Sequence, residues 1–523
     1  MALTGIDPND PIPATRRELI FGAGLSSQGP NREVVLYGNI TAAGSEPLDA
    51  LGRFISDDSD AQARFGVRSE LYQMYMKYTA VDSGATVYGV AVTESAGMSA
   101  ECTFLFATNS DATTTLEINV IGETMYVPVG NGDTPTIIAA AAADAINAGA
   151  DATLPVTAIA AAGLVTIEAA NAGLRGNFII GDPGLTFGIR MSFDKPTTTT
   201  IVKTVTQAGT VPDIGTTAID SVANSEIYYQ VSPWHQNSAS STVGNTAPVV
   251  DNDGQNGELM AMIRTQALPI NGKEQCALSA FVDDQAGATS VGTALNSVRG
   301  FVFHTERNDW TPAMLAAQNT AVVRSQQVAQ PAANFAGYQS SDSAVYQILA
   351  PFDVNDRPTT TEQRADLNNG VSPIAFRPDG KAYLVRFITS RCQNSAGDSD
   401  FRARPGHITS VIDFAWNLVK QRWSSTKQPF VSDNPIQGQS ATARTTTPQQ
   451  VAAMMKQVID DLTGSTPLGQ YQGPILAPDK VTDMKGSIVA KKVTAGIAVS
   501  VDFYSVEHLY KGEFTIQETG ASY

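Results

Sequence analysis

Residues 276–304, CALSAFVDDQAGATSVGTALNSVRGFVFH, alternate between apolar and mixed segments in a way that is typical of one class of fold. Apolar residues dominate Cys276–Val282 and again Gly300–His304, as expected of strands that are buried on both faces. Between them, Thr289–Val298 has the length and composition of a helix. A strand, a helix and a second strand in this order predict a parallel pair joined by a crossover helix.

The same alternation continues on the amino-terminal side of this unit. Ile227–Val231 and Thr86–Val92 have the apolar character of further strands. A helix over Gly257–Thr265 is expected after the first of them, and a helix that includes Leu71–Tyr78 before the second. The alternation stops after residue 92 and resumes at residue 210. We therefore expect one discontinuous α/β domain, residues 20–92 plus 210–350, built on a largely parallel sheet.

Residues 93–209 differ in composition from the sequence on either side. They are rich in Ala, Thr, Gly and Asn, and alternating segments such as Leu116–Val120 are typical of half-buried strands. One helix is expected here, because Thr134 can cap it, Pro135 suits its first position and Gly149 can end it. These features predict a small, mixed, β-rich domain inserted into the first.

The last part of the chain, residues 351–523, is predicted to be a third, α+β domain. Along Ile408–Trp423 the apolar residues recur on one helical face, and Asp413 and Asn417 lie on the opposite side. We expect this helix to dock on a large body through its apolar face. The expected fold class is therefore α+β and α/β multidomain, with a discontinuous α/β domain, an insertion and a carboxy-terminal α+β domain.

A second carboxy-terminal helix has clear signals at both ends. Thr447 can cap it, Pro448 fits its first position and Gly464 can end it, with a stripe of Val and Met between them. β alternation follows over residues 497–504. The opposite end of the chain, residues 1–19, is rich in Pro and Asp and is expected to be an extended arm.

The composition limits the classes of function. At about 100 to 200 residues per domain, 523 residues suit three or four folded units. The net charge of −17, from 34 Lys and Arg against 51 Asp and Glu, would repel a phosphate backbone and argues against nucleic-acid binding. Cys102, Cys276 and Cys392 are far apart in sequence, so neither a disulfide framework nor a CxxC metal site is expected.

The sequence has no apolar run of about 18 residues, and its amino terminus lacks the apolar core of a signal peptide. We therefore expect no membrane insertion and a protein that is made, and stays, in the cytoplasm.

Motifs for catalysis or cofactor binding are incomplete. Gly272-Lys273 and Gly380-Lys381 are not followed by the Ser or Thr of a P-loop, and the four histidines share no metal-binding spacing. Ser424–Lys427 matches SxxK, but the KTG element of the penicillin-recognising enzymes is missing. Adjacent carboxylates such as Asp283-Asp284 suit helix ends and solvent better than an acid/base pair. We expect no enzyme, no cofactor and no metal.

The segment Ala365-Asp366-Leu367-Asn368-Asn369-Gly370-Val371-Ser372-Pro373-Ile374 is followed by Gly380 and an expected strand over Tyr383–Ser390. It resembles a segment, LNxxGVNPI followed by a glycine and a strand ending in R-x-IT, that introduces the carboxy-terminal domain of contractile tail sheath proteins. These occur in myophages, including Mu-like ones, with relatives in R-type pyocins and type VI secretion. The W-G-x-R-T motif that is usual in this family is missing here, so the resemblance implies a remote branch of the family.

Four further features are similar to this family. An extended arm precedes the strand in GPNREVVLYG, residues 29–38, and a helix with Trp416 and Trp423 leads to a final β unit. The insertion, residues 93–209, looks like the outer domain of Mu-like sheaths, and residues 351–523 like the inner sheath domain.

The resemblance implies a structural subunit that polymerises helically around a tail tube, as stacked hexameric rings. The polymer would contract from a metastable extended state to drive the tube through the host envelope. The implied partners are further copies of the chain, the tail tube protein, and the baseplate and tail terminator proteins. The implied location is the virion, after assembly in the host cytoplasm. The alternatives are another tail or baseplate structural subunit, or an α/β enzyme without recognisable motifs.

The resemblance also assigns roles to particular residues. Terminal strands of neighbouring subunits would add to the sheet of a third subunit, although from the residues alone each is equally an edge strand of its own subunit. The second carboxy-terminal helix would contact the tube through charged residues away from its Met stripe, with a solvated helix face as the alternative. The linking-strand candidates are Glu18, Leu19, Ile20, Phe21, Glu513, Phe514, Thr515, Ile516 and Gln517, and the tube-contact candidates are Lys456, Asp460 and Asp461.

Overall fold

The computed structural model describes most of the chain between residues 32 and 503. The described residues are 32–94, 96–181, 188–211, 213, 215–234, 255–268, 271–333, 338–339, 348, 350–351, 353–401, 403–426, 430–431, 445–464, 474–493 and 496–503.

The centre of the molecule is a sheet whose described strands have the order β13-β15-β14-β12-β11-β10-β1-β2. From β14 to β2 all neighbours pair in parallel, whereas β15 is antiparallel to both β14 and β13. This confirms the predicted α/β architecture with a largely parallel sheet. The strands are β1 (Val34–Gly38), β2 (Val87–Ala91), β10 (Tyr229–Val231), β11 (Cys276–Phe281), β12 (Gly300–His304), β13 (Tyr338–Gln339), β14 (Ser372–Phe376) and β15 (Ala382–Leu384).

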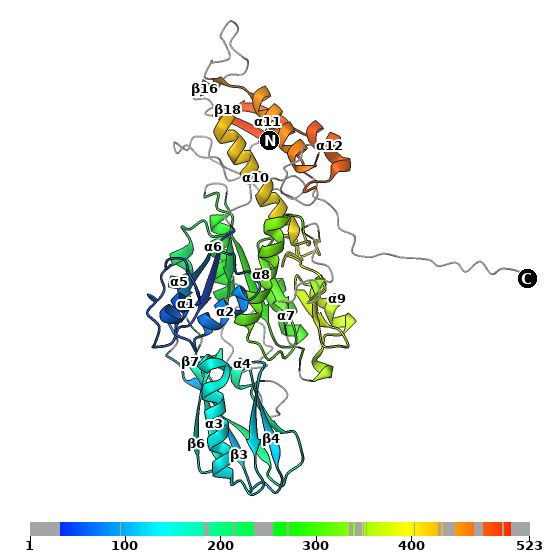
Figure 1. Ribbon diagram of the computed structural model, residues 1–523. Coiled ribbons are helices and arrows are strands. Elements are labelled where there is room, and N and C mark those ends of the chain that lie inside the picture. The colour runs from blue at the N-terminus through cyan, green and yellow to red at the C-terminus, as the bar shows by residue number, and fades with distance from the viewer. Residues whose placement is uncertain are drawn as a thin grey trace, which may run out of the picture.

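Helices cover both faces of this sheet, and sheet and helices together are called the body (Figure 1). α2 and α8 pack on one face, and α5, α6 and α7 supply the apolar residues of the core on the other. Because both faces are covered, β1, β11 and β12 are buried along their whole length. The helical segments are α1 (Asp58–Phe65), α2 (Glu70–Thr79), α5 (Thr216–Val222), α6 (Gln255–Gln266), α7 (Gln285–Leu295), α8 (Pro312–Ala329), the 3-10 helix η1 (Val354–Asp356) and α9 (Thr360–Asn368).

Local capping decides where these helices begin and end. Asp57 caps α1 by accepting a hydrogen bond from the Asp60 amide, and Gly66 ends it with a φ of 81°. α7 begins four residues before the predicted start at Thr289. The reason is that the carboxylate of Asp284 accepts a hydrogen bond from the Gly287 amide at 2.8 Å and so caps an earlier turn.

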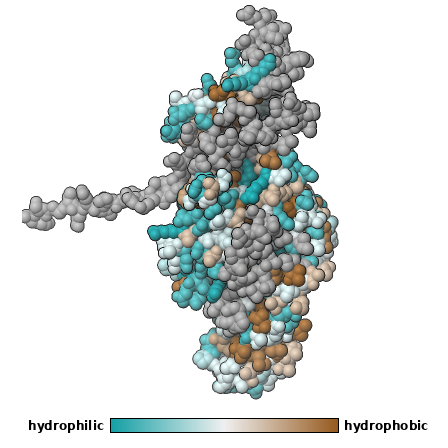
Figure 2. Space-filling view, turned by 180° about the vertical axis from the view of Figure 1, so that it is seen from behind, coloured by the Kyte–Doolittle hydropathy of each residue, from teal (hydrophilic) through white to brown (hydrophobic). Residues whose placement is uncertain are grey.

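The insertion consists of two antiparallel sheets, of order β6-β7-β3-β9 and β5-β4-β8, with α3 and α4. In Figure 2 hydrophobic side chains are conspicuous at the lower end of the molecule, where Figure 1 places the insertion. Leu105, Ile159 and Val202 are among its exposed apolar residues. Its elements are β3 (Ser99–Phe106), β4 (Thr114–Val120), β5 (Glu123–Val129), α3 (Pro135–Ala152), β6 (Val156–Ala161), β7 (Leu164–Ala172), α4 (Gly176–Ile180), β8 (Arg190–Phe193) and β9 (Ile201–Gln207).

The helix α3 does not end at Gly149 as the sequence suggested. It continues to Ala152, which takes a φ of 65°. A Cβ on residue 149 would come within 2.6 Å of the side chains of Leu154 and Met125. This glycine therefore permits close packing of the helix and does not end it.

The C-terminal unit, residues 407–503, has an apolar core of its own, to which α10, α11 and α12 contribute. α10 extends from the body into this unit (Figure 1). α11 matches its prediction, with Thr447 and Gln450 forming a capping box and Gly464 at a φ of 76°. Its elements are α10 (His407–Thr426), β16 (Phe430–Val431), β17 (Thr445–Thr446), α11 (Pro448–Leu462), the 3-10 helix η2 (Pro478–Lys480), α12 (Val481–Gly486), β18 (Val489–Val493) and β19 (Gly496–Ser500).

The body continues past residue 350, where the sequence placed a domain boundary. β14 pairs with β12, so the central sheet includes residues on both sides of that position. The strand expected over Tyr383–Ser390 ends at Leu384. Beyond it, the ring of Phe387 stacks on Phe301, with ring centroids 4.7 Å apart, which turns this segment into the core instead of along the sheet. The exact domain boundaries stay predictions.

Candidate functional site

Both predicted linking strands, Glu18–Phe21 and Glu513–Gln517, lie outside the described residues. The described residue nearest to the second one is Phe503, just beyond β19. β18 and β19 form an antiparallel hairpin, and within the described part of the chain neither strand pairs with a third. Both outer edges of this hairpin therefore offer unpaired backbone groups there.

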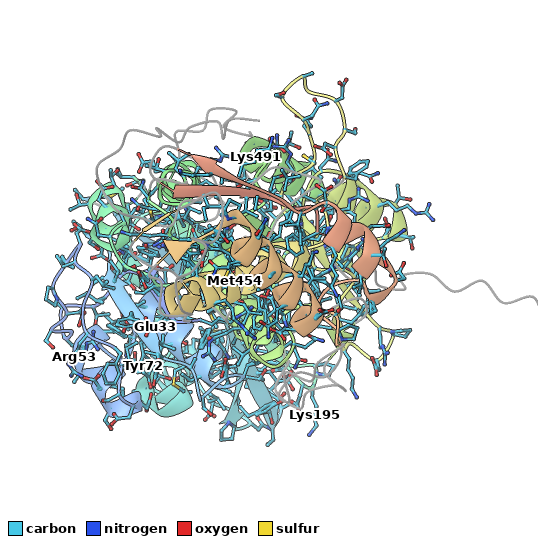
Figure 3. All side chains as sticks on the ribbon, turned by 90° about the horizontal axis from the view of Figure 1, so that it is seen from above. Glu33, Arg53, Tyr72, Lys195, Met454 and Lys491 are labelled. Atoms are coloured by element: carbon cyan, nitrogen blue, oxygen red, sulfur yellow. The ribbon has the colours of Figure 1, made fainter. Side chains whose placement is uncertain are left out.

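The hairpin packs on α11 through one of its faces. Ile497 and Val499 contact the apolar core of the C-terminal unit, whereas Lys491, which pairs with Ala498 on the other face, is exposed. Figure 3 shows the two strands lying across α11, with Met454 labelled on that helix and Lys491 on the hairpin. The sequence alternation over residues 497–504 indicated a β element here but not the open edges.

The three tube-contact candidates on α11 have different surroundings. Lys456 is exposed. Asp460 is partly buried and pairs with Lys485 of α12. Asp461 is 8% exposed and pairs with Arg422 of α10 at 2.5 Å. Lys456 is thus presented to solvent as the sequence suggested, whereas the two carboxylates have partners within their own unit.

A buried polar contact between the body and the C-terminal unit is made by Asp413 of α10. Its two oxygens accept hydrogen bonds from the Arg299 guanidinium at 2.6 and 2.7 Å, and the Tyr228 hydroxyl donates to it at 2.9 Å. The side chain of Asp413 is fully buried and that of Arg299 is 4% exposed. Although burial lowers the pKa of Arg299, the Asp413 carboxylate raises it well above its usual range.

Other polar residues of α10 extend this contact. Glu274 of the body accepts hydrogen bonds from Asn417 at 2.9 Å and from Lys420 at 3.0 Å. Arg32, just before β1, donates to the Ser410 hydroxyl at 2.7 Å. The polar side of α10, which periodicity placed away from the core, is therefore docked on the body. The helix is covered on two sides, by the core of the C-terminal unit and by the body.

A second polar contact joins the insertion to the body around Arg175, which precedes α4. Its guanidinium pairs with Glu70 at 2.7 Å, and also with Asp213 and the side-chain oxygen of Asn39. Burial raises the pKa of Glu70 to about 7, although Arg175 lowers it. Glu94, on the segment that enters the insertion, adds a third carboxylate by accepting hydrogen bonds from Asn171 and the Ala172 amide.

Two more arginines, Arg68 and Arg190, connect the insertion to the body. Arg68, between α1 and α2, donates to the main-chain oxygens of Asn147, Ala152 and Val156 at 2.7 to 3.2 Å. Arg190 of β8 pairs with Asp309 of the body through both carboxylate oxygens. Sequence reasoning missed these pairs, because nothing local to an arginine tells which distant carbonyl or carboxylate it will meet.

His304, at the carboxyl end of β12, forms a buried polar cluster with α9. Its Nδ1 lies 2.7 Å from Asp366 Oδ2, and its Nε2 lies 2.8 Å from the main-chain oxygen of Asp283. Because a carbonyl oxygen can only accept, Nε2 carries a proton and donates it to Asp283. Burial lowers the pKa of His304, but the Asp366 carboxylate raises it above its usual value. Asp283 is also buried, contrary to the solvent position expected for it, and burial raises its pKa.

These clusters join elements to one another, and their chemistry is that of structural contacts. Across the described residues, no group of three or more His, Cys, Asp or Glu side chains could hold a metal ion. The three cysteines are free and buried. No helix in the described ranges is long and apolar enough to cross a membrane.

The chain was compared with known proteins. No family model and no curated protein matches it. Two solved structures that resemble it over nearly its whole length are both described as sheath tail proteins. That of Desulfitobacterium hafniense is 10% identical, with a TM-score of 0.46, and the match covers 95% of this chain and 96% of the other. That of Listeria innocua is 12% identical, with a TM-score of 0.43, over 93% and 94%.

Proposed function

We propose that the chain is the structural subunit of a contractile phage tail sheath of the Mu-like kind. Copies assemble into a helical polymer of stacked hexameric rings around a tail tube. The polymer shortens from a metastable extended state and drives the tube through the host envelope. The partners are further copies, the tail tube protein, and the baseplate and tail terminator proteins. The protein acts in the virion after assembly in the host cytoplasm.

The hairpin β18–β19 is the observation that carries this proposal. A two-stranded sheet is only marginally stable alone, and within the described residues both of its edges are unpaired. We infer that Glu18–Phe21 of one neighbouring copy and Glu513–Gln517 of another add to it as further strands. Main-chain hydrogen bonds, each worth about 0.5 to 1.5 kcal/mol net, would then link copies that move as rigid bodies.

The polar contacts on either side of the body support rigid-body movement. The Arg299–Asp413 pair and its neighbours fasten the C-terminal unit to the body, and Arg175, Arg68 and Arg190 fasten the insertion. A subunit that keeps these contacts can change its position in a polymer without changing its own shape.

The distribution of charge supports an inner position for the C-terminal unit. Residues 405–523 contain ten Lys and Arg and ten Asp and Glu, whereas residues 1–404 contain 24 and 41. The whole net charge of −17 therefore belongs to the first 404 residues. A carboxy-terminal part without net charge can approach a tube closely at little electrostatic cost.

The test is to interrupt the linking strands without shortening the chain. Thr515→Pro removes a backbone donor from the middle of the second linking strand, and Thr519→Pro, beyond that strand, is its matched control. We also expect that deleting residues 1–21, which removes the first linking strand, or truncating after His508, which removes the second, leaves a folded subunit that cannot polymerise. Light scattering and negative-stain electron microscopy of purified protein measure the formation of long hollow cylinders.

Wild type and Thr519→Pro should form cylinders, whereas Thr515→Pro and both truncated chains should stay small while melting at the wild-type temperature. Cylinders from either truncated chain would show that the linking assignment is wrong. A wild-type chain that forms only a small closed oligomer would contradict the proposed function.

A further inference from the structure

The two ends of the central sheet differ in charge. At the β2 end, residues 46–60 run along the outer edge, where the Ile55 amide donates to the Val87 oxygen at 2.8 Å. At the other end, residues 385–404 follow β15, beginning with a hydrogen bond from the Val385 amide to Pro373 of β14. Figure 1 places α1 and α9, the helices beside these two segments, on opposite flanks of the body.

The end near β15 is basic. Residues 385–404 contain four Arg and two Asp, so this segment is positive even though Asp400 pairs with Arg391 at 3.4 Å. Arg264 of α6 lies beside Arg391 and adds a further cation. Burial, and then the neighbouring Arg386, lower the pKa of Arg404, so these cations repel one another. Among the described residues Arg404 has no carboxylate partner. Its guanidinium donates to Asn368 at 2.9 Å and stacks 3.9 Å from the ring centre of Phe401.

The end near β2 is acidic. Asp57, Asp58 and Asp60 stand in the N-cap and first turn of α1, and only Asp60 forms an ion pair within the described part of the chain, with Arg53 and Arg64. Asp58 accepts hydrogen bonds from Gln62 at 2.7 Å and from Tyr72 at 3.0 Å, which hold its carboxylate in place. The acidic end thus has negative charge in excess of its own cations.

Both ends also expose an apolar ring next to the charges. Phe54 is 53% exposed at the acidic end, and Phe401 is 42% exposed at the basic end. An exposed aromatic residue beside an excess of charge of one sign is typical of a contact surface. The two ends match each other in both respects, whereas two basic or two acidic ends would repel.

We propose that the basic end of one copy, near β15, binds the acidic end of the next copy, near β2. Copies would then join head to tail, with their central sheets following one another across the strands. The proposal rests on the proposed function, in which copies of the chain assemble, and it adds a lateral contact distinct from strand exchange. Such a contact is heterologous, because it uses a different surface on each partner and leaves one of each kind free. It can therefore extend into a ring or an open helix.

Single charge reversals test this contact. Arg404→Glu reverses the basic end and Asp58→Arg reverses the acidic end. Lys195→Glu, on an exposed residue of the insertion, is the matched control. We expect each of the first two variants to raise the protein concentration needed for assembly by about tenfold or more, and the control to leave it unchanged. Sedimentation velocity measures assembly, and thermal melting by circular dichroism checks that each variant is folded.

Mixing the two variants separates a contact between copies from one within a copy. In a mixture, the intact basic end of Asp58→Arg meets the intact acidic end of Arg404→Glu, and the two altered ends also have opposite charges. We therefore expect an equimolar mixture to assemble near the wild-type concentration although neither variant does so alone.

If Arg404→Glu assembles at the same protein concentration as Lys195→Glu, the contact is overturned, while the proposed function still stands. A loss with Arg404→Glu that mixing does not repair would also overturn it, since the basic end would then bind some other acidic partner. A wild-type chain that stays monomeric under all conditions would overturn both proposals.

Discussion

Arg299 and Asp413 are separated by 114 residues in the chain, and their side chains form a two-fold hydrogen-bonded ion pair that is almost completely buried. Arg299 directly precedes β12, and Asp413 lies on α10. The pair therefore connects the central sheet of the body to the helix that organises the C-terminal unit. In a polymer that shortens, force between the two units would pass through this contact.

We expect Asp413→Ala to destabilise the protein by about 3 to 5 kcal/mol, because it leaves the Arg299 charge buried without a partner. Urea unfolding measures this loss. Asp483→Ala is the control, since it removes a surface pair with Lys480 whose members are 60% and 46% exposed and which should contribute about 0 to 1 kcal/mol. Replacing both partners, as in Arg299→Met with Asp413→Leu, should recover much of the loss. Equal midpoints for Asp413→Ala and Asp483→Ala would contradict the assigned role.

The sequence predicted the elements whose signals are local. Thr447 and Gly464 around α11 stand where the structure has a capping box and a positive φ. Such signals act over a few residues and can be recognised without knowing the rest of the fold.

Contacts between distant parts of the chain could not be predicted in this way. The periodicity of α10 separates an apolar from a polar side, but it does not show that Asp413 will meet Arg299 in the interior. The same holds for Arg175, whose partners Glu70 and Asp213 come from the two segments that flank the insertion. Of the candidate site, the sequence suggested the helix α11 and the exposure of Lys456, but not the internal partners of Asp460 and Asp461.

We expect the stability of the protein to fall as the pH rises from about 5 to 8, in part because of Glu70. Burial raises the pKa of this carboxyl to about 7 in the folded protein, against an ordinary value of 4.5. Between these values the folded form holds a proton that the unfolded form has lost, so the free energy of unfolding decreases with pH. Glu70→Gln should remove up to about 3 kcal/mol of this decrease, because glutamine cannot ionise.

Urea unfolding at several pH values between 5 and 8 measures this slope for wild type and variant. Glu123→Gln is the matched control, because Glu123 is a carboxylate on the insertion whose side chain is 51% exposed. A Glu70→Gln slope equal to that of wild type would show that Glu70 is already ionised across this range.

We expect the insertion to be removable, because the two segments that connect it to the body lie side by side. The Thr210 amide donates to the Met98 oxygen at 3.2 Å, and the Met98 amide donates to the Thr210 hydroxyl at 3.1 Å. Replacing residues 93–209 by a short Gly/Ser bridge should give a folded chain that still assembles, as expected for a domain on the outside of the cylinder.

The excision should be combined with Glu70→Gln and Asp309→Asn, because these carboxylates lose Arg175 and Arg190 when the insertion is removed. Yield of soluble protein, thermal melting and electron microscopy measure the outcome. The excised chain without the two substitutions is expected to be less stable than the chain with them. Complete loss of folded protein in both forms would show that the insertion is part of the body's core.

We expect the proposed contact between α11 and the tail tube to depend on Lys456. The residue lies on the exposed side of α11, whereas Asp460 and Asp461 are engaged with Lys485 and Arg422. Reversing all three charges would therefore also disturb the C-terminal unit, so Lys456→Glu is the sharper test. Each exposed charge contact contributes only about 0 to 1 kcal/mol and weakens with salt, which suits a contact that must be released during contraction.

A small loss per copy becomes measurable because the contact is repeated over many copies. We therefore expect Lys456→Glu to reduce the fraction of tubes that carry extended sheath in electron micrographs. Tube-free contracted cylinders of this variant should form as in wild type. Lys480→Glu, on η2, is the control for a change of the same charge in the same unit. Equal loss of both assemblies with Lys456→Glu would show that this face of α11 packs against another subunit instead of the tube.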